Sequence, residues 1–64
     1  MYRNIIAEMA RNGLTRAMTA KKLHISVATL RKKIAGKSDW KSKEIEILLS
    51  LFGNKVSFEY LFAE

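Results

Sequence analysis

Apolar residues recur at helical spacing along nearly the whole chain, and no stretch alternates apolar and polar residues over the length of a strand. The pattern therefore predicts an all-α protein without a sheet. The first apolar stripe ends at Asn12-Gly13, a typical helix C-terminus, and comprises Ile5, Ile6, Met9 and Ala10.

Hydroxyl residues stand in front of the next two helical stretches. Thr15 precedes a stretch that ends near Lys22, and Ser26 precedes a stretch over roughly residues 27–35 that closes at Gly36. A hydroxyl at this position accepts a hydrogen bond from a free amide of the first turn, so both residues are predicted helix caps.

Two more helices are predicted in the C-terminal part. Ser42 is the predicted cap of the fourth helix and Gly53 its stop, and the expected buried stripe of this helix is Ile45, Leu48, Leu49 and Phe52. Ser57 is the predicted cap of a short fifth helix from Phe58 to Phe62. We expect one domain over residues 1–64 with five helices.

The join between the second and third helices contains neither Gly nor Pro, although the chain has to bend there. Leu23 and Ile25 are expected to point into the core on either side of His24. The backbone at His24 is expected to have a positive φ, which His adopts more readily than most residues. The bend therefore predicts a helix-turn-helix, a motif whose second helix commonly enters the DNA major groove.

Charge is distributed unevenly along the chain, whose net charge is +6. Residues 1–37 carry nine Lys/Arg against Glu8 alone, a balance of +8, whereas residues 38–64 have a balance of −2. The first part suits a polyanion, although a solvated basic surface is the plain alternative.

The residues needed for catalysis or metal binding are missing. There is no Cys, and His24 is the single His, with no carboxylate pair near it in sequence. No nucleophile, base and acid form a set. We therefore expect no enzyme activity, no cofactor and no metal. No apolar run is long enough to span a membrane, and no signal peptide is present, so we expect a cytoplasmic protein.

The segment GLTRAMTAKKLHISVATLRKKIAGK, Gly13 to Lys37, resembles the helix-turn-helix of phage repressors and Cro proteins, the lambda-repressor-like or Xre family. The matching positions are Gly13-Leu14-Thr15, Ala20, Leu23, Ile25-Ser26, Thr29-Leu30 and Gly36-Lys37. The tail VSFEYLF, Val56 to Phe62, is similar to the short last helix of these domains. The resemblance covers about half the chain and implies a compact five-helix domain.

Four residues depart from the family pattern. His24 replaces the usual Gly of the turn, and Trp40 lies in a loop that more often holds Pro. Thr19 stands where the family has a buried Leu, beside an apolar Met18 that we expect to be exposed. Lys33 occupies a commonly apolar position, with Ile34 taking over one residue later.

The resemblance also implies which residues face DNA: the residue that starts the second helix, and those at the start of the third. In this chain they are Arg16, Ser26, Val27, Ala28, Thr29 and Lys32. Lys37, and Arg31 or Lys33 depending on helix rotation, are placed for backbone contacts. Val27 and Ala28 have no hydrogen-bonding side chains, so they can read only shape or thymine methyl groups.

The aromatic tail suggests a second surface. Phe58 and Leu61 share one helix face, which we expect to close the core, so that Tyr60 and Phe62 point outward. These two residues and exposed Met18 are the candidate contacts for a weak homodimer or a protein partner.

Two functions follow from these features. The first is a Cro-like transcriptional regulator of a phage or prophage, which binds operator DNA in a bacterial cytoplasm and associates with the nucleoid. The second is an antirepressor that uses the same fold to bind a repressor protein. Binding to a membrane surface as a basic peptide is a third and much less favoured function, because the apolar stripes are already needed to form a core.

Overall fold

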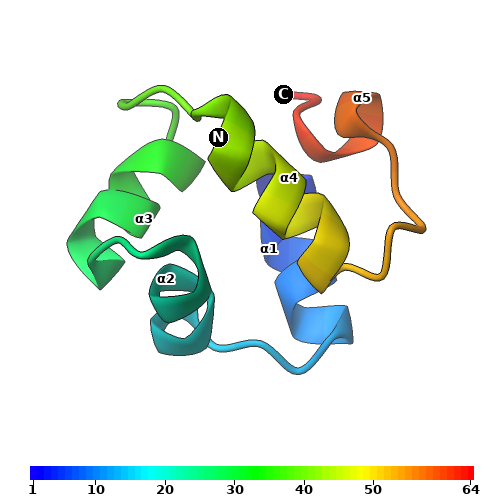
Figure 1. Ribbon diagram of the computed structural model, residues 1–64. Coiled ribbons are helices and arrows are strands. Elements are labelled where there is room, and N and C mark those ends of the chain that lie inside the picture. The colour runs from blue at the N-terminus through cyan, green and yellow to red at the C-terminus, as the bar shows by residue number, and fades with distance from the viewer.

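Five helices and no strand make up the computed structural model, which describes all residues 1–64. They are α1 (Arg3–Arg11), α2 (Arg16–Leu23), α3 (Val27–Ile34), α4 (Ser42–Leu51) and α5 (Phe58–Leu61). Figure 1 shows α2 and α3 on one side of the molecule, α5 on the other and α4 between them, with α1 behind. The prediction of an all-α protein is confirmed.

One apolar core joins the five helices. It consists of Ile5, Met9, Ala20, Leu23, Leu30, Ile34, Leu48, Phe52 and Leu61. The small side chain of Ala20 lies in this core, and α2 packs against both α3 and α4. The N-terminus is tied to the end of α3, because the Tyr2 N–H donates to the Ile34 carbonyl at 2.9 Å.

The first four helices end in the same way. In each, the chain leaves the helix through a residue with positive φ, and two backbone hydrogen bonds close a Schellman motif. Gly occupies this position after α1, α3 and α4. After α2 the position belongs to His24, with φ 59° and ψ 39°, as predicted for the turn.

The predicted caps are confirmed for three helices. The hydroxyls of Thr15, Ser26 and Ser57 each accept a backbone N–H at 3.1 Å. The prediction for Ser42 is wrong: α4 already begins at Ser42, and the Lys41 N–H before it donates to the Glu44 carboxylate at 2.9 Å.

Two expected buried stripes need correction. In α1, Ala10 is exposed and Glu8 is buried instead. The Glu8 carboxylate accepts hydrogen bonds from Tyr60 Oη at 2.9 Å and from Arg11 Nη1, which offset part of the cost of burying it. In α4, Ile45 is only half-buried, and Ile47 packs against the core.

Candidate nucleic-acid interface

The turn between α2 and α3 is held rigidly by backbone hydrogen bonds. The Ile25 N–H donates to the Ala20 carbonyl at 3.0 Å, and the His24 N–H donates to the Lys21 carbonyl at 3.2 Å. Leu23 is buried and Ile25 half-buried, so both anchor the turn to the core. The start of α3 is thus placed by α2.

The first turn of α3 presents fewer free groups than the sequence suggested. Val27 is half-buried and packs against the core, so only part of its side chain is left for the predicted contact with DNA. Ser26 Oγ already takes part in two hydrogen bonds, because it accepts the Thr29 N–H and donates to Thr29 Oγ1 at 2.9 Å. Thr29 is half-buried, and Ala28 is exposed.

Farther along α3, Arg31 and Lys32 are exposed, as is Lys37 just after the helix. Arg16 at the start of α2 is also exposed. Of the charged residues predicted to face DNA, these four are therefore accessible. The sequence-based selection missed the exposed Lys21 and Lys22 of α2, although their place in the acid-free segment was a signal.

Arg31 and Lys33 were the two predicted alternatives for a contact with the DNA backbone, and the structure excludes Lys33. Its side chain is buried, with 6% of its surface exposed, so it cannot take the role of a backbone contact. Its Nζ lies 2.9 Å from Glu44 Oε1 and 2.7 Å from the Asp39 carbonyl oxygen, to which it donates. Nζ also lies 5.8 Å from the centroid of the Trp40 ring. The Lys33–Glu44 pair was not predicted from the sequence. Lys33 follows the buried Leu30 by three residues and so lies near the buried side of α3, where a cation requires a partner.

The state of Glu44 follows from competing effects. Burial raises its pKa, but hydrogen bonds from the Lys41 N–H and from Lys33, together with the Lys33 charge, outweigh burial, so that the pKa is lowered from its usual value. Glu44 therefore stays ionised at neutral pH and neutralises Lys33.

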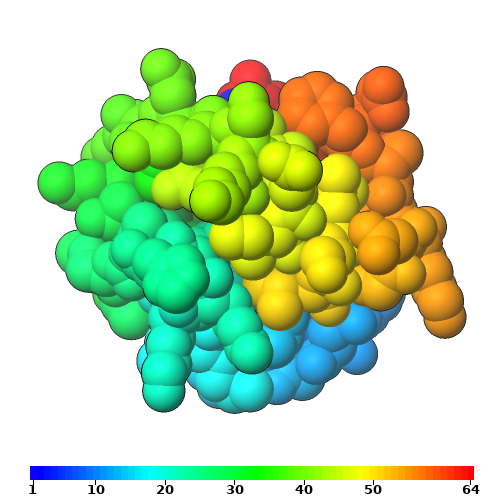
Figure 2. Space-filling model, viewed as in Figure 1, coloured from blue at the N-terminus to red at the C-terminus, as the bar shows by residue number.

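The charge that residues 12–37 leave on the surface is all positive. Residues 12–37 contain seven Lys/Arg and no Asp or Glu. With Lys33 buried, the six exposed cations are Arg16, Lys21, Lys22, Arg31, Lys32 and Lys37. We call this set the cationic face. Figure 2 shows the part of the chain that includes α2 and α3 (cyan to green) on one side of the molecule, opposite the C-terminal segment (orange).

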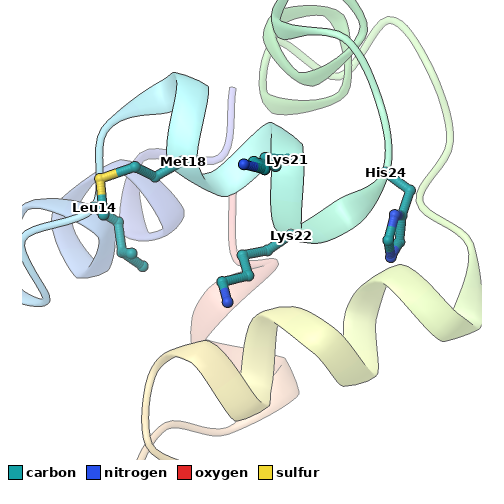
Figure 3. A pocket seen from close by; sticks show the side chains of 5 residues that line it. All are labelled: Leu14, Met18, Lys21, Lys22 and His24. Atoms are coloured by element: carbon teal, nitrogen blue, oxygen red, sulfur yellow. The ribbon is translucent and has the colours of Figure 1, made fainter.

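A hollow of about 560 Å³ lies along α2 (Figure 3). Leu14 and Met18 lie together at one end, and Met18 is 48% exposed, as expected. Lys22 and His24 extend toward α4, and Lys21 completes the lining. This surface combines apolar contact area with cationic groups.

The predicted orientation of the tail is wrong. Phe58 does not close the core but is 48% exposed, and Leu61 alone is buried. Tyr60 turns inward to Glu8. Phe62 is half-buried, with ring centroids 5.3 Å from Tyr2, 5.6 Å from Trp40 and 4.9 Å from Phe58.

The structure brings no three His, Cys, Asp or Glu side chains together as a set that could hold a metal ion. None of the five helices is both long enough and apolar enough to cross a bilayer. Comparisons of the chain with models of protein families, with curated proteins and with solved structures found no match.

Proposed function

We propose that the protein is a sequence-specific, double-stranded DNA-binding transcriptional regulator of the Cro-like type. In this proposal α2, the turn at His24 and α3 form the helix-turn-helix of a lambda-repressor-like domain, and α3 enters the major groove. The observation that carries it is the cationic face: six exposed Lys/Arg on a 26-residue segment without one acidic residue. We place its action in the cytoplasm of a bacterial host, at the nucleoid.

Phosphate contacts are assigned to the ends of the two helices. Arg16 lies at the start of α2 and Lys37 just beyond α3, so they would contact DNA phosphates on either side of the major groove. The Val27 and Ala28 amides at the start of α3 have no intrahelical partner and would support a phosphate as well, whereas the Thr29 amide is capped by Ser26.

Base contacts are assigned to the exposed side of α3. Ala28 and Lys32 are four residues apart and share one side of the helix, and Arg31 lies next to them. Ala28 is small enough to approach a thymine methyl group, while the long cations can reach guanine edges or phosphates. Since Val27 is half-buried, we expect few direct contacts to bases and an affinity dominated by phosphates.

The proposal is tested by selecting bound fragments from random duplexes and measuring the affinity of variants for the selected site. Lys32→Ala should weaken binding by about 1–3 kcal/mol if Lys32 reads a base. Lys55→Ala is the matched control, because Lys55 is also exposed but lies outside the cationic face. Equal losses in both variants, or no enrichment of any duplex, would contradict the proposal.

A second candidate function has its own supporting observation. The hollow of Leu14, Met18, Lys21, Lys22 and His24 offers apolar and cationic contacts on the side of α2. An antirepressor would use such a surface to bind a repressor protein. Binding of a repressor that is lost in Met18→Asp, without any binding of DNA by the wild type, would favour this function.

The proposal includes a weak homodimer that forms on two half-sites. The exposed aromatic available for it is Phe58. Phe58→Asp should then abolish cooperative binding to two half-sites and leave binding to one half-site unchanged.

A further inference from the structure

Three consecutive cations occur in α3, Arg31-Lys32-Lys33, and only one of them is buried. Successive residues of a helix point about 100° apart, so the residue that turns inward decides which two turn outward. The contacts that turn Lys33 inward therefore also determine which side of α3 is presented to a ligand.

The buried Lys33 ammonium group has two hydrogen-bond acceptors and an aromatic ring beside it. It donates to Glu44 Oε1 at 2.9 Å and to the Asp39 carbonyl at 2.7 Å, and the Trp40 ring lies on a further side at 5.8 Å. Glu44 Oε1 also accepts the Lys41 N–H at 2.9 Å. These bonds tie the end of α3, the following loop and the start of α4 into one closed unit.

A buried ion pair is a poor source of net stability, because desolvation offsets much of the attraction. It is directional, however. Leu30 and Ile34 already bury one side of α3. An apolar side chain at position 33 would leave a small rotation about this side open, whereas the ammonium group has its partners in only one orientation. The pair is therefore better explained by orientation than by stability.

We infer that the Lys33–Glu44 pair fixes the rotation of α3 about its axis and so determines which α3 side chains meet DNA. Both are positioning residues: neither faces DNA, and each acts through Arg31, Lys32 and Ala28. This inference rests on the proposed function for its consequence in binding, but the fixed rotation itself can be measured without DNA.

The first measurement uses the wild-type protein. NMR should show the Lys33 ammonium protons protected from exchange with water, with the exposed Lys21 and Lys22 ammonium groups as internal references. If Lys33 exchanges as fast as these two, the pair does not hold α3 and the inference is overturned.

The second measurement compares variants. Lys33→Met/Glu44→Leu replaces the pair by apolar side chains and should broaden the amide signals of α3 and the Trp40 indole signal, while signals of α1 and α5 stay sharp. The ratio of affinities for the selected site and for random duplex should fall about tenfold or more. Lys43→Met/Glu46→Leu is the matched control, because it makes the same kinds of change at exposed positions of α4.

Glu44→Gln keeps Oε1 as an acceptor for both donors, removes the charge and replaces Oε2 by an amide group. It should retain sharp α3 signals and a specificity within about twofold of the wild type, which follows if geometry rather than charge fixes the helix. Sharp signals and full specificity in the apolar variant, or a tenfold loss in Glu44→Gln, would overturn the inference. Should the apolar variant not fold, the Lys33 exchange rate and Glu44→Gln still decide. If the wild type binds no DNA, the proposed function fails, and the NMR signals of α3 still test the rotation.

Discussion

His24 shows how a single residue determines the bend between α2 and α3. Its backbone has φ 59°, a region in which a side chain with a Cβ atom is strained and Gly is not. His24→Gly should therefore leave the free energy of unfolding unchanged or raise it by up to about 1 kcal/mol. His24→Val should lower it by more than about 1 kcal/mol, because β-branched residues fit this region poorly. Chemical denaturation measures both; a stability loss with Gly that equals the loss with Val would contradict this account.

Two phenylalanines of the tail make a second residue-scale test. Phe62 contacts the rings of Tyr2 and Trp40, whereas Phe58 is exposed. Phe62→Ala should lower the free energy of unfolding by about 2–3 kcal/mol, and Phe58→Ala by less than about 1 kcal/mol. Thermal and chemical unfolding measure the two changes, and the opposite ranking would restore the orientation predicted from the sequence.

The residue-scale features that could be predicted are those set by neighbours in sequence. The caps at Thr15, Ser26 and Ser57 and the positive φ of His24 depend on a few adjacent residues, and they were predicted correctly. The burial of Glu8 was not predicted, because one of its partners, Tyr60, is 52 residues away. Helical spacing alone counts a glutamate as a surface residue.

At the scale of elements, the connection between α3 and α4 should depend on pH through Glu44. Its pKa in the folded protein is lowered from 4.5. A lowered pKa means that the ionised carboxylate stabilises the fold above the pKa of the unfolded chain, and that this contribution is lost as pH falls through the folded pKa. The difference in unfolding free energy between wild type and Glu44→Gln should therefore be constant above about pH 5 and shrink at lower pH.

Denaturation curves at a series of pH values measure this difference. Glu46→Gln is the control, since Glu46 is exposed on the same helix and forms no ion pair. Its difference from the wild type should stay small throughout. A Glu44→Gln difference that is flat down to pH 3 would show that the carboxylate does not contribute as described.

The existence and order of the five helices could be read from apolar spacing and stop residues, because both are local. The rotation of two helices about their own axes could not be predicted from these local features. In α5, four residues are too few for periodicity to distinguish Phe58 from Phe62, and contacts with Tyr2 and Trp40 decide. In α3, spacing from Leu30 allowed Arg31 or Lys33 to face outward, and Glu44 on another helix decides.

At the scale of the whole molecule, every exposed charged side chain before position 38 is positive. The cationic face carries six exposed Lys/Arg, while the single acidic residue before position 38, Glu8, is buried and paired with Arg11. The charge imbalance could be predicted from the sequence, but the burial of Lys33 could not. Of the seven Lys/Arg in residues 12–37, six therefore remain available to the proposed interface.

The salt dependence of binding to duplex DNA tests the central claim most directly. Each phosphate contact should contribute about −0.9 to the slope of log K against log salt concentration. With four to six of the exposed cations engaged, we expect a slope of roughly −4 to −5, reduced by about one in Arg16→Ala and unchanged in Lys55→Ala. A slope near zero, or an equal reduction in both variants, would contradict DNA binding through the cationic face.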